Sequence, residues 1–246
     1  MKYVLTLSQE EEKVHEKEFS KKLCRYTLTG LKPGKLYKVE LSTMTGAILT
    51  RDSIVDYLLT KPLPVDKLRA SVEATGAFLE WSTEGVVDGE TVVEVKTHDD
   101  NETDDEKVEE IFLPPTVTSY TLASLAPLTT VTVSVSVRYV LGFYISTSDL
   151  RHTTFTTPPH PPTNLRKRSR EASQLVMEWD PPVETIPGGK YRVVVSSTEG
   201  GYRASTEEEG TVFVFTMPDS GVGHRYKVQV VYAVHGVESS PVEAVF

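Results

Sequence analysis

The chain has 246 residues, of which 39% are hydrophobic and 25% charged, and its formal net charge is −9 at pH 7. This composition is that of a globular protein long enough for two or three domains of about 100 residues, and it argues against disorder throughout. No run of 18 apolar residues occurs, so we expect no membrane contact by this chain itself. The acidic balance and the lack of a groove-reading helix argue against nucleic acid as a partner.

The first element with a clear pattern is the stretch TLTGLKPGKLYKVEL, residues 27–41. Pro33 and Gly34 have turn chemistry. Tyr37, Val39 and Leu41 then alternate with polar residues, as a strand with one buried face requires. The stretch therefore predicts a turn that leads into a strand.

The same unit returns later in the chain, over residues 120–135 and 214–232. Leu28 and Leu122 are 94 residues apart, and Met217 follows 95 residues later. A second marker agrees, because Trp81 and Trp179 are 98 residues apart. A period of this length indicates a repeated domain rather than a solenoid repeat.

Within each period the apolar residues alternate with polar ones. The alternating sets are Val131, Val133, Val135, Val137 and Tyr139; Leu175, Met177 and Trp179; and Tyr191, Val193 and Val195. No stretch of comparable strength has the spacing of an amphipathic helix. Short strands separated by Gly, Pro, Asp and Thr turns predict an all-β protein built of antiparallel β-sandwiches.

These residues resemble the fibronectin type III module. Each full unit has a proline-flanked entry and a tryptophan at the place of strand B, and the run from Leu31 to Tyr37 looks like the family's E–F turn followed by its strand-F tyrosine. The resemblance implies tandem sandwiches over residues 62–158 and 159–246, preceded by a partial one over residues 1–61. The middle unit departs from the pattern, with Val131 at the tyrosine position and Leu128 at the turn glycine, and the last unit replaces the turn with residues 218–221.

The partial unit is identified by spacing. Tyr191, at the expected strand C, precedes Met217 by 26 residues, and Tyr3 precedes Leu28 by 25. Residues 1–61 are therefore expected to hold strands C to G and to lack A and B, which leaves an inner face open. We expect it to be completed by residues outside this chain, either preceding Met1 or held non-covalently. The single cysteine, Cys24, precedes strand E and is expected to be a strand residue, with a reactive or intermolecular thiol as the alternative.

The middle unit holds most of the net charge, with 6 basic and 16 acidic side chains over residues 62–158. Much of it lies in HDDNETDDEKVEE, residues 98–110, which we interpret as a solvated loop between strands C and E. The alternative is a calcium or basic-partner site, although the aspartates do not have calcium-loop spacing. The triplet at Asn101 is a glycosylation acceptor if the protein is exported.

Basic residues gather at the start of the last unit, where Arg166, Lys167, Arg168 and Arg170 fall within five residues. In a regular strand Arg166, Arg168 and Arg170 would share one face, able to contact a sulfated glycosaminoglycan or an acidic protein patch. The alternative is a solvated edge strand kept from pairing by its charges.

Catalytic patterns are lacking. The six histidines are scattered, and there is no metal-binding histidine pair, nucleophile elbow or phosphate-binding glycine loop. We therefore expect no enzyme activity, cofactor or metal in this chain.

The resemblance implies a function in binding and spacing. We expect a non-catalytic extracellular or cell-surface segment of a receptor or adhesion protein that binds a cell-surface or matrix protein. The residues look most like the fibronectin arrays of receptor-type tyrosine phosphatases and tenascin-like matrix proteins. The alternatives are an intracellular structural array of the titin kind and a spacer in a secreted enzyme.

Overall fold

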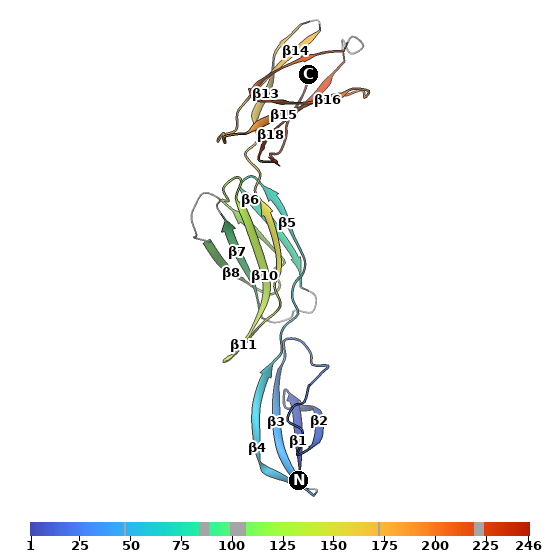
Figure 1. Cartoon of the computed structure of the whole chain (residues 1–246), viewed down its shortest axis with the longest axis vertical. Coiled ribbons are helices and arrows are strands. Elements are labelled where there is room, and N and C mark those ends of the chain that lie inside the picture. The colour runs from blue at the N-terminus through green and yellow to red at the C-terminus, as the bar shows by residue number, and fades with distance from the viewer. Residues whose placement is uncertain (47, 84–88, 99–106, 172, 219–223) are drawn as a thin grey trace.

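The computed structural model describes residues 1–46, 48–83, 89–98, 107–171, 173–218 and 224–246. Over these residues the secondary structure is entirely β, in antiparallel sheets that follow one another along an elongated molecule with the termini at opposite ends (Figure 1). The expected all-β class built of antiparallel sheets is confirmed. In the described part of the chain, no helix is long and apolar enough to cross a membrane.

The N-terminal part is a single sheet with the order β2-β1-β3-β4. Its strands are β1 (Lys2–Gln9), β2 (Glu12–Ser20), β3 (Leu36–Thr45) and β4 (Ile48–Leu59). The turn before β3 has the predicted form: Gly34 has a φ of +63°, and the backbone N–H of Lys32 donates to the Tyr37 hydroxyl at 2.9 Å.

One expectation for this part is wrong. Residues 24–28, including Cys24, form no strand, and Cys24 is exposed. The sequence has the alternation of a strand there, but a strand requires a hydrogen-bonded neighbour, and none of the four strands of the sheet pairs with this segment.

The middle part has two facing sheets. One has the order β5-β6-β9, and the other has the order β11-β10-β7-β8 with β12 paired to β10. The strands are β5 (Asp66–Glu73), β6 (Gly76–Ser82), β7 (Glu90–His98), β8 (Lys107–Leu113), β9 (Ser119–Ala123), β10 (Thr130–Leu141), β11 (Tyr144–Thr147) and β12 (Arg151–Thr156).

The C-terminal part repeats this plan. Its sheets have the orders β13-β14-β17 and β16-β15-β18-β19, with β20 paired to β18. The strands are β13 (Thr163–Arg170), β14 (Gln174–Asp180), β15 (Lys190–Ser197), β16 (Arg203–Glu208), β17 (Val212–Thr216), β18 (Tyr226–Val234), β19 (Val237–Glu238) and β20 (Val242–Val245).

Each sheet pair encloses its own hydrophobic core. Trp81, on β6, is 5% exposed and packs with the buried valines of β7 and β10. Trp179, on β14, is 2% exposed and meets the ring of Tyr191 on β15, with ring centroids 5.3 Å apart. The period-two alternation thus places the apolar side chains of each strand on the face that is buried between the two sheets.

Contacts join the N-terminal sheet to the middle part. The rings of Tyr57 and Tyr144 lie 5.9 Å apart, and Lys61 forms an exposed ion pair of 2.9 Å with Asp149. Gly34 lies against Tyr139, because a Cβ added at this glycine would be 3.4 Å from the tyrosine ring. Exposed ion pairs contribute little to stability, whereas the two tyrosine rings add an aromatic contact at this joint.

Candidate binding surface on the basic edge strand

The four predicted basic residues lie on β13, at the edge of the sheet β13-β14-β17. All four side chains are exposed. The pairing of β13 with β14 shifts register twice, between Thr163 and Arg166 and between Lys167 and Ser169. Bulges and charges are features that keep an edge strand from pairing with another chain.

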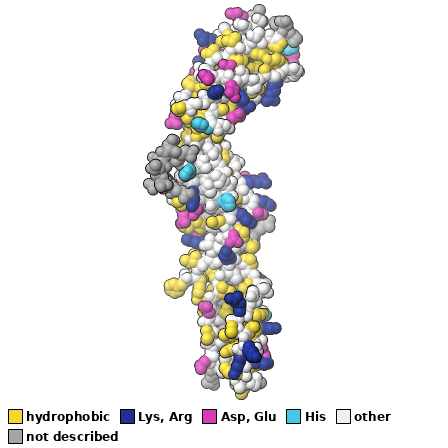
Figure 2. All heavy atoms as spheres, viewed as in Figure 1, with side chains coloured by type: hydrophobic (Ala, Val, Ile, Leu, Met, Phe, Trp, Pro, Cys, Tyr) yellow, Lys and Arg dark blue, Asp and Glu magenta, His cyan; other side chains and the backbone are white. Residues whose placement is uncertain are grey.

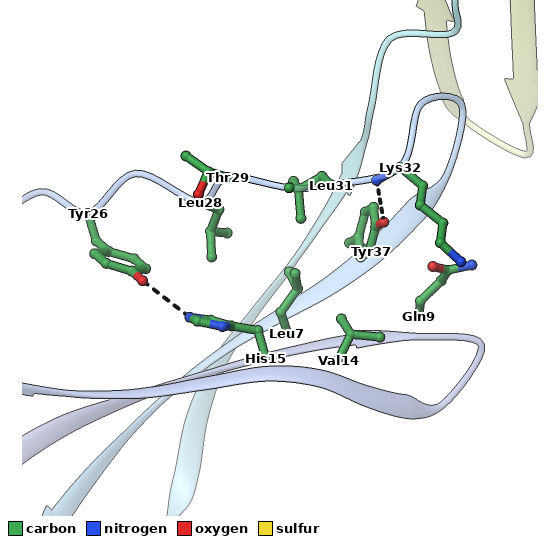
Figure 3. A pocket seen from close by; sticks show the side chains of 11 residues that line it. Leu7, Gln9, Val14, His15, Tyr26, Leu28, Thr29, Leu31, Lys32 and Tyr37 are labelled. Atoms are coloured by element: carbon green, nitrogen blue, oxygen red, sulfur yellow. Dashed lines mark hydrogen bonds between the residues drawn. The ribbon is translucent and has the colours of Figure 1, made fainter.

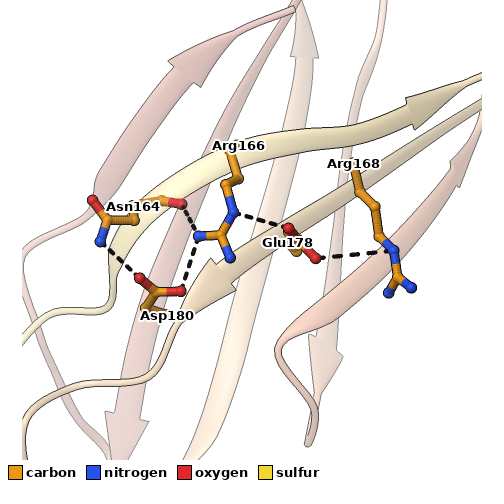
Figure 4. Close-up of polar contacts among 5 residues, drawn as sticks. All are labelled: Asn164, Arg166, Arg168, Glu178 and Asp180. Atoms are coloured by element: carbon orange, nitrogen blue, oxygen red, sulfur yellow. Dashed lines mark hydrogen bonds and ion pairs between the residues drawn. The ribbon is translucent and has the colours of Figure 1, made fainter.

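Arg166 is neutralised by carboxylates on the neighbouring strand (Figure 4). Its Nε donates to Glu178 at 2.8 Å and its Nη1 to Asp180 at 2.9 Å. Asn164 also donates to Asp180, at 2.7 Å. The hydrogen bonds from Asn164 and then Arg166 lower the pKa of Asp180, and the bonds to Asp180 and Glu178 raise the pKa of Arg166. This arginine is therefore committed to an intramolecular network.

Arg168 and Lys167 are less engaged. Arg168 Nε lies 4.0 Å from Glu178, at the limit of an ion pair, and 61% of the Arg168 side chain is exposed. Lys167 makes no ion pair with any residue that the structure describes. These two cations are the ones available to an external anion.

The prediction that Arg166, Arg168 and Arg170 share one face is wrong for Arg170. The second register shift inserts an extra residue into β13, which reverses the alternation after Lys167. Arg170 consequently pairs with the buried Leu175, and its Nη2 lies 3.8 Å from the sulfur of Met217. The outer face of β13 therefore carries Arg168 with Arg166 beside it, both near Glu178. Lys167, which pairs with the buried Met177, is exposed but lies on the other face of the strand, as Arg170 does.

The carboxylate partners were the part that the sequence argument overlooked. Glu178 and Asp180 alternate with Met177 and Trp179, so a buried face for the tryptophan places both carboxylates on the outer face of β14. The alternation in the sequence indicates that Glu178 and Asp180 face outward, but their contact with Arg166 could be predicted only if β13 was known to pair with β14.

Asn101, the predicted glycosylation site, lies outside the described residues, as do the aspartates of the acidic run. The predicted loop over residues 98–110 is wrong at both ends. His98 is the last residue of β7, and β8 begins at Lys107, so Glu109 and Glu110 lie in a strand. In the described part of the chain, no group of three His, Cys, Asp or Glu side chains could hold a metal ion.

Comparison with known proteins finds distant relatives of this chain. No protein-family model matches it. It is 27% identical to tenascin-R of Gallus gallus over 175 residues, 71% of this chain and 12% of that protein. It is 26% identical to tenascin-R of Homo sapiens over 216 residues, 87% of this chain and 15% of that protein. The chain thus spans less than a sixth of the curated relatives it matches.

Two solved structures are also similar. A two-domain fibronectin type III segment of chicken tenascin has a TM-score of 0.45 at 18% identity, covering 74% of this chain and 98% of that one. The FN1-FN3 domains of chicken CNTN1 have a TM-score of 0.34 at 11% identity, covering 100% of this chain and 88% of that one.

Proposed function

We propose that the chain is a non-catalytic, extracellular segment of an adhesion or receptor protein. In this proposal residues 1–61, 62–158 and 159–246 are three fibronectin type III units, the first of them partial. They act as a spacer that displays a binding surface to a cell-surface or matrix protein. The similarity to tenascin-R over most of the chain supports the adhesion context. The ectodomain of a receptor-type tyrosine phosphatase remains a narrower prediction, in which catalysis would reside in another domain.

The surface that we propose for the ligand is the exposed edge of β13, where Arg168 lies on one side of the strand and Lys167 on the other. The observation that carries it is the contrast within one strand: Arg166 is paired with two carboxylates, whereas Lys167 is exposed and outside that network. A sulfated glycosaminoglycan presents closely spaced anions that an ammonium and a guanidinium bind through charge-assisted hydrogen bonds. An exposed edge strand is open to a long, linear ligand, so we favour this class over a globular acidic patch.

Heparin affinity tests this proposal. The full chain is applied to immobilised heparin at low salt and eluted with a salt gradient, because contacts between exposed charges weaken with ionic strength. We expect the Lys167→Ala/Arg168→Ala variant to elute at clearly lower salt. Lys21→Ala/Lys22→Ala is the matched control, since it removes the same charge from exposed residues of the N-terminal part. Equal losses for the two variants, or no retention of the unaltered chain, would contradict the proposal.

Export is tested separately on the protein from its natural source. We propose that Asn101 carries a glycan, since the Asn101-Glu102-Thr103 triplet is an acceptor only in an exported protein. Glycosidase treatment is expected to increase electrophoretic mobility and to leave aspartate at position 101 in the peptide mass spectrum. If aspartate were found only at an asparagine other than Asn101, the proposed site would be wrong.

A further inference from the structure

The middle part lacks a buried tyrosine that the other two parts have at the equivalent position. Tyr37 on β3 and Tyr226 on β18 are 3% and 1% exposed. Val131 on β10 follows Tyr37 by 94 residues and precedes Tyr226 by 95. It is buried as well, but a valine has neither the ring nor the hydroxyl. The middle sandwich therefore keeps the buried position and loses a ring and a hydrogen-bonding group.

In the N-terminal part this tyrosine satisfies a turn. The Tyr37 hydroxyl accepts a hydrogen bond of 2.9 Å from the backbone N–H of Lys32 (Figure 3). Leu7 and Leu31 line the same small cavity as the tyrosine. The Lys32 carbonyl in turn accepts a hydrogen bond of 2.7 Å from Thr60 Oγ1. The ring thus fills apolar space while its hydroxyl pairs with the main chain.

The middle part builds the same turn without the tyrosine. Ala126 follows Lys32 by 94 residues, and its carbonyl accepts a hydrogen bond of 2.6 Å from Thr157 Oγ1, just as Lys32 accepts one from Thr60. The Ala126 N–H, however, has no hydrogen-bond partner among the residues that the structure describes. The donor that Tyr37 satisfies in the N-terminal part is therefore available to a ligand in the middle part.

A cavity of about 430 Å³ lies beside this N–H, whereas the corresponding cavity that Tyr37 lines is about 220 Å³. The two correspond because their lining residues repeat at 94 residues: Leu28, Leu31 and Lys32 in the first, and Leu122, Leu125 and Ala126 in the second. The buried Val95 and Leu122 also line the larger cavity. An apolar cavity of about 150 Å³ is enough to bind benzene, so the larger cavity has room for a phenol ring.

The larger cavity opens between two edge strands. β8 is the last strand of one sheet of the middle part, and β9 is the last strand of the other. Lys107 and Glu109 of β8 line the opening, and Glu109 pairs with Val95, which places it on the cavity face of the strand. Charged side chains of both signs also lie on the surface of the middle part (Figure 2). Free strand edges of this kind bind extended polypeptide through main-chain hydrogen bonds.

We propose that this cavity binds a tyrosine side chain on an extended segment of a partner polypeptide. The ring packs beside Val95 and Leu125, and its hydroxyl accepts the Ala126 N–H in the way that the Tyr37 hydroxyl accepts the Lys32 N–H. The main chain of the partner lies along the edge of β8 or β9. A free phenol would use the cavity without using either edge, so the edges favour a polypeptide. This site is separate from the β13 surface and does not depend on it.

The experiment uses the full chain labelled with ¹⁵N, in which the amide signals of Leu125 and Ala126 are followed by NMR. One probe is p-cresol, which is the tyrosine side chain alone. The others are two short serine- and threonine-rich peptides, one with a central tyrosine and one with phenylalanine in its place. We expect p-cresol and the tyrosine peptide to shift both signals, with the peptide binding more tightly. The phenylalanine peptide should bind about five- to tenfold more weakly than the tyrosine peptide, the factor for one net hydrogen bond.

Two variants block the cavity in different ways. Glu109→Trp places a ring over the opening and should abolish the shifts. Glu110→Trp is the matched control, because Glu110 is the next residue of the same edge strand, is also exposed, and lies on the opposite face away from the cavity. Val131→Tyr supplies the missing ring from within and should also abolish binding. If Val131→Tyr does not fold, the tryptophan pair of variants still decides the outcome.

Four results would overturn the proposal. The first is unchanged Leu125 and Ala126 signals with both p-cresol and the tyrosine peptide. The second is equal binding by Glu109→Trp and Glu110→Trp, and the third is equal affinity for the two peptides. The fourth is binding of p-cresol with no gain in affinity for the tyrosine peptide, which would assign the cavity to a small phenol instead of a polypeptide.

Discussion

Replacing Trp179 with alanine is the sharpest test of the division into independent sandwiches. The side chain is 2% exposed and lies edge-on to Tyr191. Its indole N–H has no hydrogen-bond partner among the described residues, so the substitution removes packing alone.

The cost follows from the buried area. Removing roughly 200 Å² of buried aromatic surface, at about 25 cal/mol per Å², gives about 5 kcal/mol as an upper value. Measured tryptophan-to-alanine substitutions in cores cost about 3–5 kcal/mol, so we take about 4 kcal/mol. For a unit of about 90 residues this lowers the midpoint temperature by roughly 15–30 °C, enough to unfold the C-terminal sandwich well before its neighbour.

Hydrogen exchange of the full chain, resolved by strand, measures this directly. In the Trp179→Ala variant we expect faster exchange in β15 and β18 and unchanged exchange in β7 and β10. Trp81→Ala should give the reverse pattern, and Phe143→Ala, at a fully exposed side chain, should change neither. Equal loosening of both sandwiches by Trp179→Ala, or a loss below about 1 kcal/mol, would refute the reasoning.

Three further predictions concern single contacts. Gly34→Ala should destabilise the N-terminal part by about 1 kcal/mol, because this residue has a φ of +63°; urea unfolding measures it, and an unchanged midpoint would count against the turn geometry. Tyr37→Phe should cost about 1 kcal/mol, because the hydroxyl accepts a 2.9 Å hydrogen bond from a backbone N–H; a cost-free substitution would remove that bond from the account. The pKa of Asp180 is lowered below its usual 3.8 by Asn164 and Arg166, so the stability it contributes is present above that pH and is lost as the pH falls through the folded-state pKa. In urea unfolding at several pH values, the deficit of Asp180→Asn should therefore be constant near neutrality and disappear in acid, and a deficit that grows in acid would contradict the sign.

The parts of the fold predicted from sequence are those set by local periodicity. Alternation buries one face of a strand whatever its neighbours are, so the valines of β10 and the tryptophans of β6 and β14 could be assigned to cores. The repeat of about 95 residues also indicated that the two sandwiches have equivalent strands and cores.

The predictions that were wrong concern features that depend on pairing between strands. The bulge after Lys167 is a property of the register of β13 against β14, so Arg170 could not be placed by counting along one strand. The segment at residues 24–28 has a strand sequence but no ladder. Repulsion among the acidic residues predicted a loop to residue 110, whereas β8 begins at Lys107 because β7 supplies a partner for it.

Lysine footprinting tests the central claim, which is that β13 presents the binding surface. The full chain is treated with an amine-reactive acetylating reagent with and without a heparin-derived oligosaccharide, and the acetylation of each lysine is quantified by mass spectrometry. We predict that Lys167 is protected in proportion to oligosaccharide occupancy, while Lys13, Lys21 and Lys190 keep their reactivity. Protection of lysines on the N-terminal sheet with Lys167 still reactive would contradict the claim.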